Sequence, residues 1–218
     1  MAVCLLIAAL ALHLAASALP GDARIPAGLA LGVVALVVAR MTSLSMTDLG
    51  LARDAWRGGL LWGGAAAALV MTGYAAALVI TDSMPEPRYD SWSDAVFAAL
   101  VLIPIGTVIP EELVFRGVVW GLLRRARGAQ TATIASSLLF GLWHVVPALG
   151  GGPANDALAG AVGPGSIGTV LSVLATVVVT GVAGVVLCVI RQRSDSLLAP
   201  VLLHWAVNAG GVLFVLVA

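Results

Sequence analysis

Charged residues are scarce in this sequence. Its 218 residues include 11 basic and 11 acidic side chains, and every basic one is arginine because lysine is absent. An ordinary soluble domain is about 25% charged, whereas this chain is 10% charged. So few charges could not cover the surface of a soluble protein. The composition therefore excludes a soluble enzyme, a disordered chain and a nucleic-acid binder with a basic face.

Cysteine is also scarce. The chain has two, Cys4 and Cys188, and each lies in an apolar run. Neither belongs to a spacing that is typical of a disulfide framework or a metal site. We interpret both as small hydrophobic residues in the packing of the protein.

Apolar residues, in contrast, make up 61% of the chain, and the mean hydropathy is +1.07. A helix needs about 20 apolar residues to cross a bilayer. Seven runs approach that length: 2–19, 26–39, 59–81, 94–123, 129–149, 167–190 and 196–217. Helices satisfy their own backbone hydrogen bonds in lipid, and no run alternates with the period of a barrel strand. We therefore predict an all-α, polytopic transmembrane bundle that forms a single domain over residues 1–218.

Two of these runs have a second interpretation. The run 94–123 contains Pro104 and Pro110, which could kink the helix or split it and give eight spans. The run 2–19 could be a cleaved signal peptide, because residues 16–18 (Ala-Ser-Ala) resemble a cleavage site. No basic residue precedes that run, however, which favours a retained helix.

The arginines are distributed unevenly between alternate loops. With the N-terminus placed inside, only Arg24 and Arg88 fall in outside loops. The inside loops hold Arg40, Arg53, Arg57, Arg124, Arg125, Arg127, Arg191 and Arg193. Basic residues concentrate on the cytoplasmic side of membrane proteins. The pattern predicts a multi-pass protein of a bacterial-type plasma membrane, with a cytoplasmic N-terminus and an external C-terminus.

Two local features concern the packing of this bundle. Residues 42–57 mix apolar and charged side chains, and they read equally well as a short helix in the membrane interface or as a plain loop. Glycines four residues apart, such as Gly28 and Gly32 or Gly59 and Gly63, are typical of close helix packing. We interpret them as packing positions only.

Ionisable side chains within spans are costly and point to function. Glu112 and Arg116 are four residues apart on one helix, so we expect them to pair. Glu111 is rotated by about 100° from Glu112 and should face a different neighbour, which leaves it as the candidate general base. A purely structural ion pair would not require this second, adjacent glutamate. His13 stands alone in its span, and we assign it to packing.

The remaining polar residues lie on two later spans. His144 alone could be either a hydrogen-bonding residue between helices or a catalyst. His204 and Asn208 are four residues apart and share one helix face, which favours a common polar target. Glu111, His144 and His204 lie roughly 18, 22 and 12 Å from the cytoplasmic ends of their spans, by helix rise. These depths allow three helices to place their side chains around one cavity.

The ordered motifs Glu111-Glu112-xxx-Arg116, Phe140-xxx-His144 and His204-xxx-Asn208 resemble the CPBP family. That family includes the type II CAAX prenyl endopeptidases and the bacteriocin-processing or immunity-type Abi proteins. The resemblance covers roughly residues 94–212, which would form the catalytic core, and the first three spans contribute little to it. Members often have eight transmembrane helices, where seven are predicted here.

This resemblance implies hydrolysis of a peptide bond within the membrane. Glu111 would activate a water that His144 helps to hold, and His204 with Asn208 would stabilise the oxyanion. The support residues of the site would be Glu112, Arg116 and Phe140. These residue types suit such roles, since a carboxylate accepts a proton and imidazole and amide groups donate to an oxyanion. The three motifs contain no Ser or Cys, which argues against a covalent route.

Several alternatives stay open. We expect no cofactor, but Glu111, His144 and His204 could instead be zinc ligands, although no His-Glu-x-x-His sequence is present. A non-enzymatic immunity or peptide-binding protein could use the same polar cluster. A proton-coupled transporter ranks lowest, because the polar residues share one depth and do not line a path. The expected partners are a peptide or membrane-protein substrate and the lipid bilayer, with no nucleic acid; nothing in the sequence sets the oligomeric state.

Overall fold

A computed structural model describes residues 23–80, 89, 91–150 and 166–217, with a few residues between 4 and 15. The predicted span 2–19 lies largely outside the described residues, and His13 lies wholly outside them. Every regular element in the described ranges is helical and none is a strand. The all-α prediction is therefore confirmed for this part of the chain.

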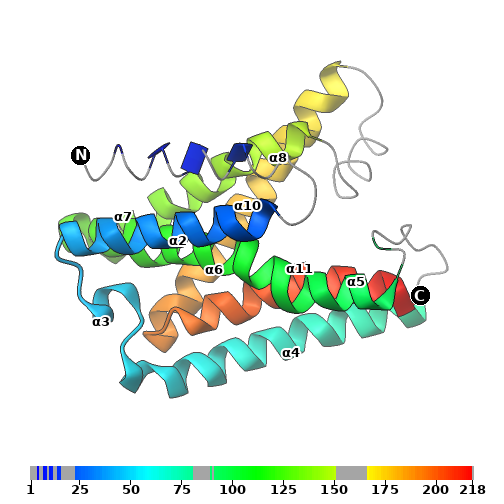
Figure 1. The fold of residues 1–218 in the computed structure, drawn as a ribbon, viewed down its shortest axis with the longest axis horizontal. Coiled ribbons are helices and arrows are strands. Elements are labelled where there is room, and N and C mark those ends of the chain that lie inside the picture. Colours follow the sequence, from blue (N-terminus) through cyan, green and yellow to red (C-terminus); the bar gives the residue numbers. More distant parts are fainter. Residues whose placement is uncertain are drawn as a thin grey trace.

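Five helices form most of the bundle (Figure 1). They are α2 (Arg24–Met41), α4 (Trp56–Ile80), α7 (Trp120–Trp143), α10 (Ser166–Ser194) and α11 (Leu198–Val217). α4 packs along α11, and α10 packs along the second half of α7. Helices that are far apart in the sequence are thus neighbours in space. Residues from α7, α10 and α11 can therefore lie close together.

Four segments are long and apolar enough to cross a membrane, which indicates an integral membrane protein. They are Arg24–Met41, Met46–Ile80, Trp92–Leu149 and Ser166–Ser194. The stretch Leu198–Phe214 of α11 is also apolar and is shorter than these segments. The prediction of seven spans is not confirmed, because the runs 94–123 and 129–149 fall within one segment and the run 2–19 is largely outside the described residues.

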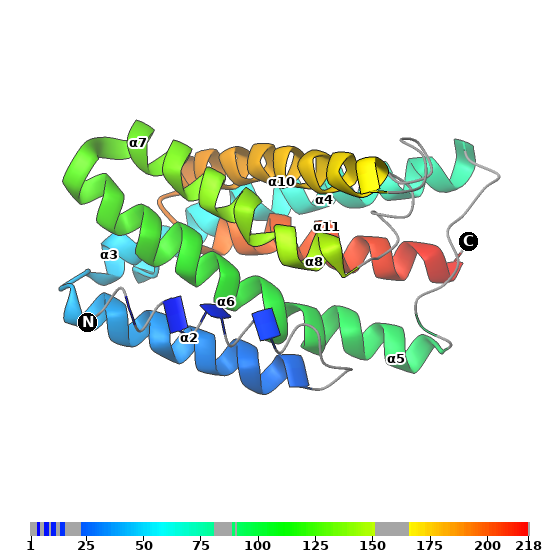
Figure 2. The same ribbon diagram turned by 90° about the horizontal axis from the view of Figure 1, so that it is seen from above.

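The segment 92–149 is a helical hairpin. Its first arm begins with α5 (Trp92–Phe97), and its last turn is α8 (Val145–Leu149). Gly128, with φ 83° and ψ 169°, interrupts α7 between the arms. This backbone conformation suits glycine because glycine has no Cβ. Figure 2 shows the first arm running to the Gly128 turn and the second arm returning beside it.

The two prolines of the first arm do not split it, contrary to the eight-helix alternative. The helix instead widens into three π-helical stretches, η3 (Ala98–Leu102), η4 (Pro104–Val108) and η5 (Leu113–Val119). Proline cannot donate a backbone hydrogen bond, and wider π turns let the helix continue around it. Such stretches are frequent at functional sites.

The carbonyl group left free by Pro104 connects this arm to α11. The Ile103 N–H donates to the Ala98 carbonyl, five residues back. In the same register Pro104 would donate to Ala99, but it has no N–H. The indole Nε1 of Trp205 donates to the Ala99 oxygen at 2.7 Å. A proline and a tryptophan that are distant in sequence therefore fasten two helices together.

Residues 42–57 contain a short helix, as one of the two interpretations predicted, although it covers only part of this range. They contain one short helical turn, α3 (Met46–Leu49), and a 3-10 turn, η2 (Arg53–Ala55). The Ser45 hydroxyl accepts from the Asp48 N–H, and the Asp48 carboxylate accepts from the Ser45 N–H. This capping box starts α3.

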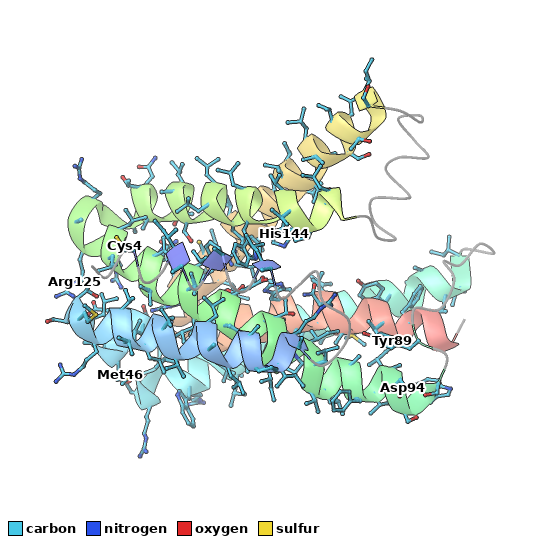
Figure 3. All side chains as sticks on the ribbon, turned by 45° about the horizontal axis from the view of Figure 1, so that its top comes forward. Cys4, Met46, Tyr89, Asp94, Arg125 and His144 are labelled. Carbon is cyan, nitrogen blue, oxygen red and sulfur yellow. The ribbon has the colours of Figure 1, made fainter. Side chains whose placement is uncertain are left out.

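Arginine-bearing loops gather at one end of the bundle. Arg125, near the hairpin turn, donates to the Ser43 carbonyl at 2.9 Å. Arg191, near the end of α10, donates from Nη2 to the Asp48 carbonyl at 3.1 Å. Figure 3 shows the labelled Arg125 and Asp94 at opposite ends of the molecule. The loops that the arginine distribution assigns to the inside therefore lie near one another in space.

Close approach between helices occurs at particular glycines. A Cβ at Gly28 of α2 would lie 2.5 Å from the carbonyl oxygen of Ile105. A Cβ at Gly63 of α4 would lie 2.8 Å from the Cα of Ala199. A Cβ at Gly32 would meet no atom of the described residues within 4 Å. The packing prediction is confirmed for Gly28 and Gly63, and the described part of the chain does not confirm it for Gly32.

This difference predicts unequal effects of one substitution at two positions of α2. Gly28→Ala should lower the free energy of unfolding by about 1–3 kcal/mol, because the new methyl group meets backbone that cannot move aside. Gly32→Ala should leave it unchanged or raise it by up to about 1 kcal/mol, since alanine favours a helix more than glycine does. Unfolding by detergent titration would measure both, and equal losses would contradict the close contact at Gly28.

Candidate active site

The two adjacent glutamates lie on α6 (Ile109–Glu112), between the π-helical stretches η4 and η5. Glu111 is 4% exposed and Glu112 is 0% exposed. The core around them comes from α2, η5 and α7, and includes Val114, Phe115 and Phe140. Two carboxyl groups at full burial need specific partners, because an unpaired buried charge is strongly unfavourable.

Glu112 has two such partners. Its Oε1 atom accepts from Arg116 Nη1 at 2.9 Å and from His204 Nδ1 at 2.8 Å. The predicted pairing of Glu112 with Arg116 is therefore confirmed. The contact to His204 links the first arm of the hairpin to α11, across 92 positions of sequence.

Arg116 is as deeply buried as its partner. Its guanidinium carbon lies 4.0 Å from the centroid of the Phe140 ring, which is a favourable cation–π distance. The Nε and Nη2 atoms have no hydrogen-bond partner among the described residues. Phe140 thus supports a buried cation, in addition to its hydrophobic contacts.

Glu111 faces α7, away from the Glu112 partners. Its Oε1 atom accepts from the indole Nε1 of Trp143 at 3.0 Å. Its Oε2 atom is buried and has no hydrogen-bond partner in the described part of the chain. The prediction that the two glutamates contact different neighbours is confirmed. A buried carboxylate oxygen of this kind is usually satisfied by water or by a ligand.

His144 lies where α7 ends. Pro147 lacks the N–H that would bond to the Trp143 carbonyl, so the helix bends here. The His144 N–H bonds to Gly141 at 3.1 Å, and the Phe140 carbonyl accepts from the His144 ring at Nδ1, at 2.8 Å. Since Nδ1 carries a proton, Nε2 is a free acceptor in the neutral ring. Figure 3 shows His144 between the two ends of the bundle.

Phe140 contacts both histidines. Its ring centroid lies 4.7 Å from that of His144 and 5.7 Å from that of His204, each in an edge-to-face arrangement. These contacts place the imidazole that follows α7 and the imidazole of α11 against one shared ring. The three predicted motifs therefore meet in the structure, as their similar depths indicated.

Asn208 follows His204 by one turn of α11 and is half-buried. Its amide makes no hydrogen bond to the described residues. The preceding carbonyl, of Val207, accepts from the Tyr74 hydroxyl at 2.9 Å. Tyr74 fits there because a Cβ at Gly210 would lie 2.6 Å from its ring. The α4–α11 contact thus fixes the turn that carries Asn208.

The alternative zinc site is not supported by this geometry. No three His, Cys, Asp or Glu side chains in the described ranges gather closely enough to hold a metal ion. Glu111, His144 and His204 therefore do not form a common ligand set, and we derive no step through zinc.

A comparison with protein families agrees with the motif resemblance. A family model described as type II CAAX prenyl endopeptidase Rce1-like matches residues 92–210, which is more than half of the chain. The chain belongs to this family. The matched region of this CAAX endopeptidase family member contains all seven candidate residues, from Glu111 to Asn208. No curated protein and no solved structure matches the chain.

Two contact residues of this family member were absent from the sequence prediction. They are Trp143, which binds Glu111, and Tyr74, which fixes the turn before Asn208. A signal for Trp143 exists in the sequence, because an indole N–H within a membrane needs an acceptor and a glutamate at similar depth is a candidate. Tyr74 has no comparable signal, since its acceptor is a backbone carbonyl.

The buried ion pair predicts a large stability difference between two arginine substitutions. Arg116→Leu should lower the free energy of unfolding by about 3–5 kcal/mol, because it leaves Glu112 buried without its cation. Arg125→Leu should lower it by less than about 1 kcal/mol, since Arg125 lies 4.0 Å from Asp48 and both side chains are accessible to solvent. Detergent titration of both variants would measure the difference, and a loss below 1 kcal/mol for Arg116→Leu would refute the structural role of the pair.

Proposed function

We propose that this protein is an intramembrane endopeptidase that hydrolyses a peptide bond with an activated water and without a metal. Membership of the CAAX endopeptidase family supports a peptide hydrolase. The observation that carries the mechanism is the Oε2 atom of Glu111, a buried carboxylate oxygen with no partner among the described residues. Such an atom can accept a proton from water in a site of low dielectric constant.

Glu111 and His144 would hold the water between them. One proton of the water would bond to Glu111 Oε2 and the other to His144 Nε2, which is the free acceptor of that ring. Glu111 would remove its proton as the water oxygen attacks the peptide carbonyl carbon. Glu111 would then return this proton to the amide nitrogen as the C–N bond breaks, which leaves a carboxylic acid and an amine.

His204 and Asn208 would stabilise the negative oxygen of the tetrahedral intermediate. The Asn208 amide can donate directly. His204 uses Nδ1 toward the Glu112 carboxylate, so its Nε2 can donate only when the ring is an imidazolium. The Glu112 carboxylate would orient the His204 ring through Nδ1, in the way that a buried carboxylate orients the histidine of a hydrolytic triad.

A covalent mechanism has less support. Ser136, which is buried, donates its hydroxyl to the Phe115 carbonyl at 2.8 Å. Cys188 is 0% exposed and lies behind α7. Neither side chain is free to attack a substrate, and a covalent route needs a nucleophile beside a base.

The proposed substrate is a membrane-associated or lipidated peptide. The family description names prenylated CAAX sequences, whose lipid would place the peptide at the bilayer. The arginine-rich end of the bundle would lie on the cytoplasmic side, as the bias toward basic cytoplasmic loops favours. A substrate could then reach the buried site from the lipid or from that side.

The Glu111→Gln variant tests the mechanism. Purified protein in liposomes would be given a peptide library in which half of the members carry a farnesylated cysteine near the C-terminus. The wild type should cleave a subset of these peptides, and Glu111→Gln should lose at least about 1,000-fold in rate, because an amide cannot accept the proton. Mass spectrometry would identify the products, and a chelator should not change the rate.

Each part of this experiment has a result that would oppose the proposal. Equal cleavage by wild type and Glu111→Gln would exclude Glu111 as the base. Loss of activity with chelator, restored by zinc, would favour a metal mechanism. No cleavage of any peptide by a folded wild-type protein would favour a non-enzymatic binding role.

A further inference from the structure

We infer that Trp143 is a positioning residue, whose indole N–H holds Oε1 of Glu111 so that Oε2 is the oxygen directed at the water. This inference rests on the proposed function, because it assigns a purpose to the Trp143 contact only if Glu111 is the base. The Trp143 Nε1 to Glu111 Oε1 distance is 3.0 Å, and both side chains are buried. A carboxylate with one oxygen held has one orientation instead of several.

The indole itself is held firmly. Trp143 is 8% exposed, and its ring meets Phe115 edge-on, with centroids 5.9 Å apart. Phe115 in turn meets Phe140 at 5.3 Å. Rotation of the indole would require these aromatic rings to move, and protein cores are too densely packed to permit this freely. The donor therefore points at a fixed place.

The position of Trp143 in the chain strengthens the inference. Trp143 is the last residue of α7, and His144, the proposed second partner of the water, follows it directly. The contact that fixes the base and the imidazole that would hold the water are thus joined by a single peptide bond. The distance between the Trp143 indole and the His144 imidazole therefore depends on local backbone geometry and not on how two helices pack. Catalytic geometry has to be held within about 0.5 Å, so a covalent link of this kind is useful.

The chemistry of the donor also suits a base. Glu112 accepts from a guanidinium and from an imidazole, and cationic donors make a carboxylate a poor proton acceptor. Glu111 accepts from an indole, which is a neutral donor. Two adjacent glutamates thus differ in the charge of their partners. The neutral donor orients Glu111 and leaves it able to take up a proton.

The test is the pH dependence of kcat/KM for Trp143→Phe, measured on a peptide that the wild type cleaves. The acid limb of this profile reports the essential base of the free enzyme. Without the indole donor the carboxylate should take up its proton at higher pH, so the limb should move up by about one pH unit. The activity at the original midpoint should fall by about fivefold.

The other ionisable groups around Glu111 stay the same in this variant. They are Glu112 and Arg116 on the same arm, His144 after α7 and His204 on α11. α2 also packs against α6, but its ionisable residues, Arg24 and Arg40, lie near its two ends. A shift of the acid limb would therefore report the loss of the indole donor.

Trp120→Phe is the matched control. Trp120 is another buried tryptophan, and its indole donates to Thr133 at 3.3 Å, away from Glu111. This variant should keep the acid limb of the wild type. If Trp143→Phe does not fold, 3-benzothienylalanine at position 143 keeps the shape of the indole and removes only its N–H.

The outcomes separate this inference from the proposed function. An inactive Glu111→Gln with an unshifted limb in Trp143→Phe would refute the positioning role and leave the mechanism intact. A fully active Glu111→Gln would refute the mechanism. If no peptide is cleaved, infrared titration of the Glu111 carboxyl band, assigned by Glu111→Gln, still tests the contact. That band should shift by about one pH unit in the position 143 variant, and an unchanged titration would refute the contact.

Discussion

The rest of the site depends on the two hydrogen bonds that the Glu112 carboxylate accepts. One of its oxygens accepts from Arg116 on its own arm and from His204 on α11, at 2.9 and 2.8 Å. Without this atom, neither the buried guanidinium nor the imidazole would have a negative partner among the described residues. Because burial of a lone charge is strongly unfavourable, the three groups are stable only together. Their association fixes α11 against the hairpin, and so it also fixes the turn that carries Asn208.

The helix that carries the glutamates is shaped by its prolines. Pro104 and Pro110 remove two backbone donors from the arm, and the helix widens into π turns instead of breaking. The carbonyl of Ala99 that Pro104 leaves free accepts from Trp205, the residue after His204. His204 and Trp205, which are adjacent on α11, therefore contact the same arm at two positions along its length. This arrangement holds the acidic residues and the α11 motif in register.

Much of the site could be predicted from the sequence, for specific physical reasons. The pairing of Glu112 with Arg116 follows from helix periodicity alone, and the same period explains why Glu111 faces a different neighbour. The family resemblance was confirmed by the match to residues 92–210. The roles of Glu111, His144, His204 and Asn208 in catalysis stay predictions.

Other features depend on tertiary contacts, which periodicity does not encode. The hairpin at Gly128 and the π turns around Pro104 are backbone features that helix periodicity does not predict. The free carbonyl of Ala99, for example, is tolerated because Trp205 reaches it from α11. The contact of Trp143 with Glu111 joins residues 32 positions apart, and only their similar depth hints at it. The count of seven spans was based on hydropathy and is not confirmed, because four segments of the described residues are long and apolar enough to cross a membrane.

The most direct test of Glu112 as the common anchor is ¹⁵N NMR of the histidine ring nitrogens. The chain has three histidines, so His204 can be assigned by comparison with a His204→Gln variant. In the wild type the Nδ1 atom of His204 should carry the proton of the hydrogen bond to Glu112, and Glu112→Gln should change the ¹⁵N signal of this nitrogen. A His204 Nδ1 without a proton in the wild type, or ring signals that are unchanged by Glu112→Gln, would contradict the central role of this carboxylate.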